Sequence, residues 1–480
     1  MQQASAAKTS DKFLYDQVSN HVMELVDAGI LKPGDKAPSL RKLSQQLKVS
    51  ITTVSQGYSL LAERGILESR PQSGFYVNPV VKQPDLPRKT TTCCRPRRVR
   101  FGELFEEVFA VANDPAVVPL GAAVPAMELL PVKGLQRATN RVLARHAEAC
   151  MNYCFAPGHL RLREEIARRY VEIGLAVDPE DVIVTTGATE ALALSLQTVA
   201  QRGDIVAVES PMYFSVLRLI EKLGMLAVEL DTDPETGICL DALESVLETM
   251  DIKAVVTVPN FSNPIGSLMP EDHKQRMVEV LEAAGVPLIE DDIYGELYFD
   301  DTRPRVAKCY ERKGGVFSCS SFSKTLAPGY RIGWVIADRQ YHHRILEWKQ
   351  ASSSASSSLG QYAIAEYLAS GEYERHVQRL RNAYRTQTEQ MRFMLAQHFP
   401  KGTRISNPRG GFVLWVEMPR GNDCIEVFNR ALERGISLLP GILFSATRRY
   451  KNFIRISCGQ PWSEQLEQSV IELAGMIVSQ

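Results

Sequence analysis

A lysine among small hydroxyl residues is the first candidate for chemistry in the sequence. Lys324 lies in the segment Ser-Ser-Phe-Ser-Lys-Thr at 320–325, and Arg331 follows seven residues later. In a small, mostly apolar setting a lysine loses its proton readily, and the neutral amine can attack a carbonyl carbon to form an imine. Hydroxyls and an arginine can hold a phosphate nearby. An isolated segment of this kind would also fit a surface loop.

A second candidate is the turn Val-Thr-Thr-Gly-Ala-Thr-Glu-Ala at 184–191. The apolar residues before it predict a strand, and those after Gly187 predict a helix. A helix N-terminus presents unpaired N–H groups and a positive dipole end, which suit a phosphate. A plain junction between a strand and a helix would have the same pattern.

Three further residues have the chemistry of a ring-binding site. Asn263 follows one apolar run, and Asp291 and Tyr294 follow another. A buried acid that faces a pyridine nitrogen keeps this nitrogen protonated, so that the ring can accept electrons from a carbanion. Asn and Tyr side chains can hydrogen-bond the phenolate oxygen of such a ring.

The elements that must position these residues alternate between apolar runs and helical stretches. Short runs rich in Val and Ile lie at 182–184, 205–208, 254–258, 286–289 and 316–318. Such runs between helices predict a parallel sheet covered on both faces. Ligands of these sheets bind in the loops at the carboxyl ends of the strands, where the candidate residues lie.

The first 79 residues have a different pattern. Apolar residues at helical spacing predict one helix at 14–26, a second that Ser39 caps and a third that Ser50 caps. Short strands at 66–70 and 75–77 predict a hairpin. Three helices and a two-stranded wing make a winged helix-turn-helix.

Charge is distributed unevenly along the chain. The formal net charge is −1, yet residues 1–79 carry +2, residues 80–100 carry +6 and residues 101–480 carry −9. Residues 36–58 hold four basic residues and no acid, which favours DNA over a protein as the partner of the winged helix.

The segment 80–100, with three prolines and a threonine run, predicts a linker. It is either a solvated basic tether or a segment whose arginines also touch DNA phosphate or the body, namely Arg95, Arg97, Arg98 and Arg100.

Length and composition exclude several classes. With 480 residues, 45% hydrophobic and 23% charged, the chain is long enough for two or three folded domains and is not disordered. It has no apolar run of about 18 residues and no signal-peptide stretch at its start, so we expect a cytoplasmic protein. Nine scattered cysteines predict free thiols. Cys150 and Cys154 could share a helix face, but no second pair has zinc spacing, and we expect no metal.

The ordered motifs of the body resemble those of the class I and II aminotransferases, fold type I enzymes that depend on pyridoxal 5′-phosphate. The motifs are T-G-A-T-E-A, N-P-x-G, D-x-x-Y, S-x-S-K-x-x-x-P-G-x-R-x-G and a late R-x-S, over about residues 118–475. The resemblance implies that Lys324 forms the Schiff base, that Asp291 pairs with the pyridinium nitrogen and that Arg455 binds the α-carboxylate of a substrate. The other residues that it implies are Gly187, Ala188, Thr189, Ser321, Ser323 and Arg331 at the phosphate, Asn263 and Tyr294 at the phenolate, Tyr213 stacked on the ring, and Tyr153 at the phosphate of the partner subunit.

The head is similar to the GntR family of transcription regulators. The stretch PGDKAPSLRKLSQQLKVS and the residues that follow it match the pattern of this family over about residues 11–77. The resemblance implies that Ile51 replaces an arginine common in the family, which removes one DNA contact. It places the DNA-contacting residues at Ser39, Arg41, Ser50, Thr52, Thr53 and, in the wing at the minor groove, Gly74.

A GntR-type head, a basic linker and an aminotransferase-like body together resemble the MocR subfamily. The predicted domains are a mostly helical winged helix-turn-helix at 1–79, the linker at 80–100 and an α/β fold type I body at 101–480. The resemblance implies a homodimer that binds double-stranded DNA and senses pyridoxal phosphate, an amino compound, or both. The alternative is a working aminotransferase with an accessory head, since no catalytic residue is missing. The head and the basic linker favour the regulator.

Overall fold

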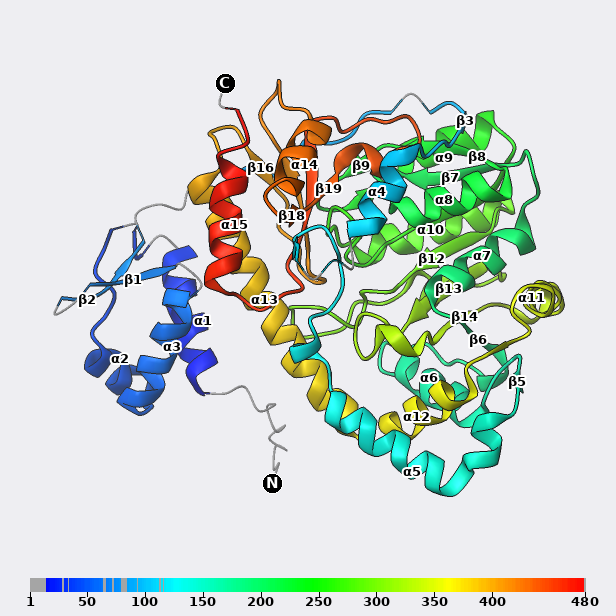
Figure 1. Ribbon diagram of the computed structural model, residues 1–480, viewed down its shortest axis with the longest axis horizontal. Helices are drawn as coiled ribbons and strands as arrows, with labels where there is room; N and C mark the ends of the chain where they lie inside the picture. The colour runs from blue at the N-terminus through cyan, green and yellow to red at the C-terminus, as the bar shows by residue number, and fades with distance from the viewer. Residues whose placement is uncertain are drawn as a thin grey trace, which may run out of the picture. The chain divides into compact units, whose positions relative to one another are not determined.

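The computed structural model describes residues 14–27, 30–32, 34–63, 66–70, 73–78, 84–92, 94–111, 114 and 116–478. Residues 1–84 with 389–398 form one compact unit, and residues 85–388 with 399–480 form the other. Figure 1 shows the N-terminal part in blue. The predicted boundary between residues 79 and 80 lies outside the described residues.

Over residues 14–78, the described part of the N-terminal unit has three helices and a two-stranded wing. The elements are α1 (Leu14–Asp27), α2 (Leu40–Leu47), α3 (Ile51–Glu63) and the antiparallel strands β1 (Leu67–Arg70) and β2 (Gly74–Val77). The Ser39 hydroxyl caps α2 by accepting a hydrogen bond from the N–H of Lys42, and the Ser50 hydroxyl accepts one from the N–H of Thr53. The predicted winged helix-turn-helix is confirmed.

The helices of this unit pack on a small apolar core. Val18 and Val22 of α1 lie against Leu43 of α2 and Val54 of α3. Gly57 allows α1 and α3 to approach closely, because a Cβ at this position would lie 2.8 Å from Val18 Cγ1. The core therefore fixes the orientation of α3 with respect to α1 and α2.

An eight-stranded sheet forms the centre of the second unit. Its order is β3 (Arg97–Arg98), β8 (Leu226–Leu230), β7 (Ile205–Glu209), β11 (Ile252–Thr257), β12 (Leu288–Asp291), β13 (Val316–Ser321), β14 (Gly333–Ile336) and β6 (Val182–Thr185). The five predicted strands all lie in this sheet and run parallel to one another, as does β8. Their carboxyl ends therefore lie at one edge.

Helices cover both faces of this sheet, as Figure 1 shows. Along β7, Val206 and Val208 belong to the core that holds α7 (Ala188–Val199), α8 (Phe214–Leu223) and α11 (Arg339–Ser352). Ala207 belongs to the core that holds α9 (Leu240–Thr249) and α10 (Glu271–Ala284). This alternation is the period of two of a strand, and it confirms the predicted α/β body.

Two strands of the sheet that the sequence did not indicate, β14 and β3, run antiparallel to their neighbours. The loop 322–332 joins β13 to β14 without an α-helix. A parallel connection needs a longer crossover, so the chain returns antiparallel. The segment that carries Lys324 is therefore a tight return at the carboxyl edge of the sheet.

The remaining elements lie outside this sheet. The helices are α4 (Glu103–Val111), α5 (Val132–Met151), α6 (Leu160–Val171), α12 (Ser358–Ala369), α13 (Glu372–His398), α14 (Cys424–Leu432) and α15 (Glu464–Ala474). The last ten residues of α13 belong to the N-terminal unit. A second, antiparallel sheet has the order β16 (Arg404–Ile405), β17 (Val413–Glu417), β20 (Phe453–Ser457) and β19 (Leu439–Pro440). Three two-stranded pairs are β4 (Val118–Pro119) with β18 (Ile436–Ser437), β5 (Cys154–Phe155) with β15 (Ala355–Ser356), and β9 (Thr232–Asp233) with β10 (Gly237–Ile238).

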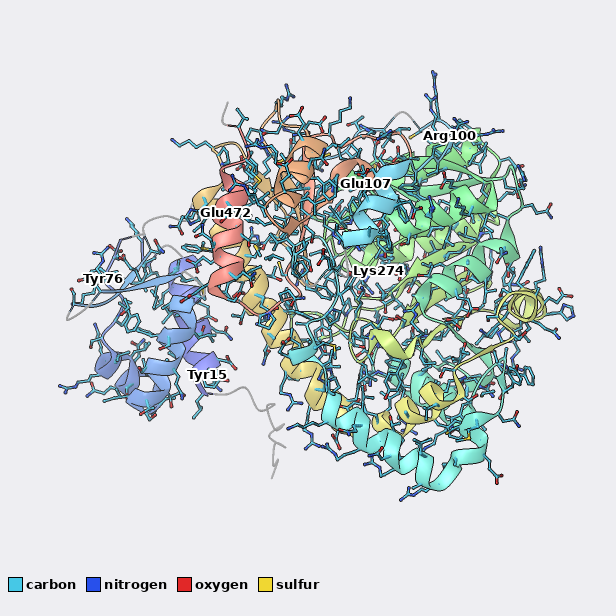
Figure 2. The ribbon with its side chains drawn as sticks, in the orientation of Figure 1. Tyr15, Tyr76, Arg100, Glu107, Lys274 and Glu472 are labelled. Carbon is cyan, nitrogen blue, oxygen red and sulfur yellow. The ribbon has the colours of Figure 1, made fainter. Side chains whose placement is uncertain are left out.

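From residue 85 on, the segment predicted as a linker lies along the body. The backbone of β3 pairs with β8, and the N–H of Arg88 donates a hydrogen bond of 3.0 Å to Glu417. The hydroxyls of Thr90 and Tyr450 are 3.1 Å apart. The segment thus contacts the body through its backbone and through side chains such as that of Thr90. The arginines predicted to contact phosphate are exposed, namely Arg95, Arg97, Arg98 and Arg100, the last labelled in Figure 2.

No helix in the described part of the chain is long and apolar enough to cross a membrane.

Candidate functional site

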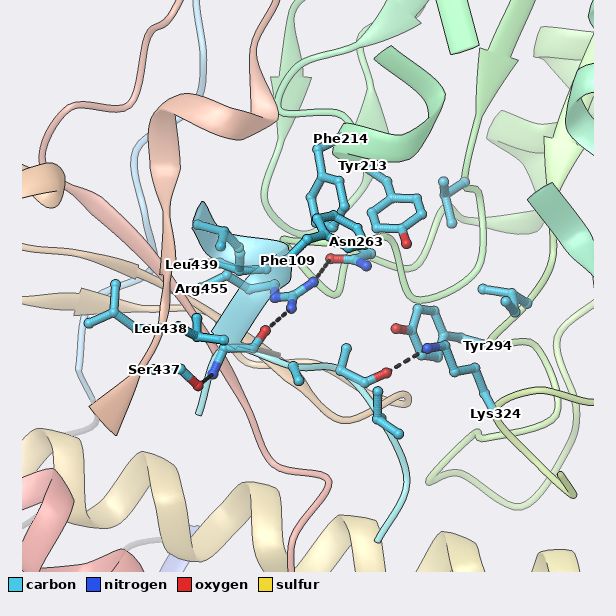
Figure 3. A pocket seen from close by; sticks show the side chains of 18 of the residues that line it. Phe109, Tyr213, Phe214, Asn263, Tyr294, Lys324, Ser437, Leu438, Leu439 and Arg455 are labelled. Carbon is cyan, nitrogen blue, oxygen red and sulfur yellow. Dashed lines mark hydrogen bonds between the residues drawn. The ribbon is translucent and has the colours of Figure 1, made fainter. Parts of the chain in front are cut away.

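The carboxyl edge of the main sheet opens into a cavity. Its walls include Tyr213 after β7, Asn263 after β11, Asp291 at the end of β12 and Lys324 after β13. Arg455, from β20 of the second sheet, closes the opposite side, as Figure 3 shows. Strands that run parallel bring these distant residues together, as the sequence predicted.

Lys324 points into the cavity. Its ammonium donates a hydrogen bond to the carbonyl oxygen of Ala123, and no carboxylate among the described residues forms an ion pair with it. Burial, and next the Arg455 cation, lower the pKa of Lys324 from 10.5 to about 8, while Asp291 opposes the shift. A substantial fraction of Lys324 is therefore neutral near physiological pH, as a nucleophilic amine must be.

Asp291 is the one acid of the run 290–292 that lines the cavity. Glu290 accepts a hydrogen bond of 3.2 Å from the Ser318 hydroxyl, and Asp292 pairs with Arg303 at 3.1 Å. Burial raises the pKa of Asp291 to about 7, and the neighbouring Asp292 adds to the shift. No cation of the described residues forms an ion pair with this carboxyl, so a protonated ring nitrogen would be a favourable partner.

Tyr213, Asn263 and Tyr294 lie around the same space. Asn263 Oδ1 accepts a hydrogen bond of 3.1 Å from Arg455 Nη1, so its amide group is held in one orientation. Tyr294 is fully buried, and burial raises the pKa of its hydroxyl. Its hydroxyl therefore stays protonated and can donate a hydrogen bond.

The N-terminus of α7 and the loop after β13 form a second part of the site. Gly187, at φ 83°, leads into Ala188 and Thr189 without a side-chain cap on the helix. Arg331 Nη2 donates a hydrogen bond of 3.2 Å to the Thr186 carbonyl, and a Cβ at Gly187 would lie 2.5 Å from this nitrogen. The Arg331 guanidinium can therefore lie against residue 187 only because this residue is glycine.

Two hydroxyls complete this cradle. Arg331 Nη1 donates a hydrogen bond of 3.4 Å to Ser323 Oγ, and the N–H of Ser323 donates one of 3.2 Å to Ser321 Oγ. Uncapped N–H groups, hydroxyls and a guanidinium that pairs with no acid in the described part of the chain are the donors that a phosphate needs. The residues of this chain fit pyridoxal phosphate at both ends, the ring at Asp291 and the phosphate here.

Arg455 is buried without an ion pair. Only 2% of the residue is exposed, and Nη1 and Nη2 donate to Asn263 Oδ1 and to the Gly121 carbonyl. Its Nε has no partner, and among the described residues no carboxylate pairs with it. Burial lowers the pKa of Arg455 from 12.5 to about 10. A buried cation without a counterion is costly, so this position suits an anionic ligand.

Tyr153 is not brought to this cavity. It is exposed and stacks on Phe155 at 5.3 Å between ring centroids. The cavity also has walls that the sequence did not indicate, contributed by the carbonyls of Gly121 and Ala123 and by apolar residues of α4 and β19. Every residue has a backbone carbonyl, so the sequence cannot indicate which carbonyls line a cavity. The apolar face of a helix has the same sequence pattern whether it lines a cavity or packs in a core.

In the head, the predicted DNA-contacting residues lie at the N-terminal ends of α2 and α3 and in the wing. Ser39, Arg41, Ser50, Thr52 and Gly74 are exposed, and Thr53 is half-buried. In the wing, Lys36 Nζ and the Arg70 guanidinium lie 5.7 and 4.4 Å from the ring centroid of Tyr76, which Figure 2 labels. Ser39 and Ser50 also cap their helices.

We expect Arg41→Ala to weaken specific DNA binding by about 1–3 kcal/mol if Arg41 reads a base. Arg41 is exposed on α2, so the fold should tolerate the change. Mobility shifts at several salt concentrations measure the effect. In the matched variant Arg98→Ala, the salt dependence of binding should become shallower instead. If the affinity for DNA changes neither with salt nor with either substitution, this placement of the DNA surface is wrong.

Cys150 and Cys154, the pair considered for a metal, are free thiols. Over the residues that the structure describes, no three His, Cys, Asp or Glu side chains gather as a metal site.

Comparison with known proteins gives matches to both parts of the chain. The family described as aminotransferase class I and II matches residues 116–471, and the gntR family of bacterial regulatory proteins matches residues 14–77. The chain is 37% identical over 465 residues to the HTH-type transcriptional regulator YdcR of Escherichia coli, a match that covers 96% of this chain and 98% of the relative. It is 35% identical over 459 residues to YjiR of the same organism, with 96% and 97% covered.

The body also resembles solved structures. The α-aminoadipate aminotransferase LysN of Thermus thermophilus, complexed with N-(5′-phosphopyridoxyl)-L-leucine, superposes with a TM-score of 0.73 at 29% identity, over 79% of this chain and 95% of that one.

Proposed function

Because the chain belongs to the MocR-type regulators, in which a GntR-type DNA-binding head is joined to a class I and II aminotransferase body, we propose that an amino acid held at Arg455 controls its binding to DNA. The chain is a transcriptional regulator, and its cofactor is pyridoxal phosphate. The proposal also includes the amino-acid effector, a homodimer, a cytoplasmic location and the roles of single residues. The presence of a DNA-binding head supports the cytoplasmic location.

The buried Arg455 carries this proposal. Its guanidinium lines the same cavity as Lys324 and has a free Nε and, among the described residues, no acidic partner. A carboxylate can accept two parallel hydrogen bonds from a guanidinium. An amino acid would satisfy both ends of the cavity, its carboxylate at Arg455 and its amino group on the side of Lys324.

Pyridoxal phosphate supplies an aldehyde that binds amines and a ring that accepts electrons. Lys324 would hold it covalently, Asp291 would keep a proton at the ring nitrogen, and Tyr213 would cover the ring. Asn263 and Tyr294 would donate hydrogen bonds to its ring oxygen. Its phosphate would bind to the donors of the cradle described above, which are Gly187, Ala188, Thr189, Ser321, Ser323 and Arg331.

One hydrogen-bonded connection links this cavity to the linker. Ser210 lies three residues before Tyr213, and its hydroxyl is 2.8 Å from that of Tyr450. The Tyr450 hydroxyl in turn contacts Thr90 of the linker. A ligand that shifts the loop around Tyr213 therefore acts on the segment that leads to the DNA-binding head, and it does so by its different affinity for two conformations.

A homodimer is supported by exposed apolar residues around Tyr153. Met151, Tyr153 and Phe155 are 83%, 72% and 62% exposed. Large apolar side chains grouped in this way are typical of an interface. In such a dimer Tyr153 would reach the cofactor phosphate of the partner subunit.

Turnover is a second candidate function, and the pKa of Lys324 favours it. A lysine that is partly neutral near pH 8 and shares its cavity with Asp291 has what a working aminotransferase needs. The two functions are compatible. Product formation from amino-acid and keto-acid pairs measures this second one.

Footprinting on the DNA upstream of the protein's own gene tests the regulator. We expect the cofactor-loaded protein to protect a site whose pattern changes when an amino acid is added, because the ligand shifts the body between two conformations. The protein without cofactor is the control. If the footprint never responds and amino acids are converted at enzyme-like rates, with kcat near ~10 per second, the protein is an aminotransferase in its main role.

A further inference from the structure

The cavity has an apolar side next to Arg455. Phe109 of α4, Phe214 of α8, and Leu438 and Leu439 gather there, and Figure 3 shows them on the Arg455 side, with Lys324 and Tyr294 opposite. We refer to Val108, Phe109, Phe214, Leu438 and Leu439 as the apolar wall.

Strand register places part of this wall directly beside Arg455. Leu439 of β19 pairs with Arg455 of β20, so the two residues are neighbours in the second sheet. Leu438 is 1% exposed and precedes it. If the carboxylate of a ligand binds Arg455, the α-carbon of this ligand therefore lies next to leucine side chains.

Aromatic rings form the other part of the wall. Phe109 stacks on Phe105 at 4.6 Å, and both meet the edge of Phe214 at 5.9 Å between centroids. Phe109 is nevertheless 47% exposed, although it lines the cavity. Its ring is thus only partly covered, and a ligand in the cavity that covered more of it would bind favourably.

The charges of the cavity are already assigned. Among its described lining residues only Asp291, Lys324 and Arg455 are charged. The cofactor takes the first two, and the α-carboxylate takes the third. An acidic side chain would be desolvated with no cation left to pair with it, which is unfavourable.

We propose that the effector is an amino acid with a large apolar side chain, aromatic or branched, and that Phe109 contacts this side chain. The inference rests on the proposed function, because it takes the carboxylate of the ligand to bind Arg455.

The position of α4 gives this contact a consequence. The helix begins at Glu103, five residues after the end of the linker strand β3, and the N–H of Phe101 in between donates a hydrogen bond of 3.1 Å to Glu221 of α8. Arg218 of α8 lies over the ring of Phe105 at 4.5 Å. A side chain that packs on Phe109 therefore contacts the helix that continues the linker.

Equilibrium dialysis of the cofactor-loaded full chain with L-phenylalanine, L-alanine and L-glutamate tests the proposal. We expect L-phenylalanine to bind at least tenfold more tightly than the other two, since burial of a phenyl ring contributes at least this much. Phe109→Ala should weaken the binding of L-phenylalanine by about tenfold and leave the affinity for L-alanine unchanged.

Trp348→Ala is the matched control. Trp348 is an aromatic side chain on α11, 40% exposed and absent from the described cavity lining, so its loss should change no affinity. The half-maximal concentration of L-phenylalanine in the footprint is a second readout and should rise with Phe109→Ala by the same factor.

Two results would overturn the proposal. One is that L-glutamate binds as tightly as L-phenylalanine, and the other is that Phe109→Ala weakens the binding of all three amino acids equally. In both cases, loss of amino-acid binding in Arg455→Ala would leave the proposed function intact. If no amino acid binds, or if Arg455→Ala has no effect on any of them, the proposed function fails as well.

Discussion

Replacement of Lys324 by alanine should remove all covalently held pyridoxal phosphate. After borohydride reduction and peptide mapping, the wild type should carry the cofactor on the peptide that contains Lys324, and Lys324→Ala should carry none. The visible absorption band of the bound cofactor should disappear with it. The effect is all-or-none because the side chain supplies the nitrogen of the bond.

The same peptide map contains its own control. Lys274 is a buried lysine, labelled in Figure 2, but its ammonium pairs with Glu271 at 3.1 Å and donates to the Arg305 carbonyl at 2.7 Å. An ammonium held by an acid is not nucleophilic, so Lys274 should stay unlabelled. Label on Lys274, or on any lysine other than Lys324, would contradict the assignment.

The pH dependence of cofactor attachment follows from the pKa of Lys324. Only the neutral amine attacks an aldehyde, and the pKa of about 8 in the cofactor-free protein makes this fraction rise as the pH increases from about 7 to about 9. Attachment rates of the cofactor-free chain should therefore rise through a midpoint near pH 8. A midpoint near the ordinary lysine value of 10.5 would show that burial does not act on this group.

The gathering of Asn263, Asp291 and Lys324 at one cavity could be predicted from the sequence because a strand signal precedes each of them. Asp291 ends a buried apolar run, and Asn263 and Lys324 follow two others. Parallel strands carry such positions to one edge, so a one-dimensional pattern is enough to gather them. Of the three acids at 290–292 only Asp291 lines the cavity, because alternation turns Glu290 away from it and Asp292 pairs with Arg303.

The second half of the cavity could not be predicted in this way. Phe109 and Leu438 are ordinary apolar residues, and only tertiary packing makes them line a cavity and not a core. Arg455 was found by resemblance alone, since its burial without an acidic partner depends on β19 and β20. Backbone hydrogen bonds to Gly121 and Ala123 have no sequence signature at all.

The linker shows the same limit. Proline and threonine content predicts an irregular segment, and Arg97–Arg98 nevertheless pairs with β8 as the edge strand of the main sheet. Strand pairing uses backbone groups, so a short edge strand needs no alternation of apolar residues. The open edge of the sheet therefore determines where the segment lies.

Replacement of Arg455 by alanine should abolish the response of DNA binding to amino acids. The change removes a charge-assisted pair of hydrogen bonds to the ligand carboxylate, worth roughly 1.5–3 kcal/mol, or about 10- to 150-fold in affinity. Basal DNA binding and covalent cofactor should remain, because Arg455 lies in neither the head nor the phosphate cradle. Footprint titrations and dialysis with the same amino acid measure the effect.

Arg455→Lys is the matched variant for this experiment. It keeps the positive charge but cannot form two parallel hydrogen bonds, so it should recover only part of the lost affinity. Thermal unfolding of both variants shows whether loss of the bonds to Asn263 and Gly121 has loosened the fold. If the footprint of Arg455→Ala still changes when amino acid is added, the carboxylate binds elsewhere. If the wild-type footprint responds to pyridoxal phosphate alone and is the same in Arg455→Ala, then the cofactor itself is the signal, and the buried guanidinium serves turnover.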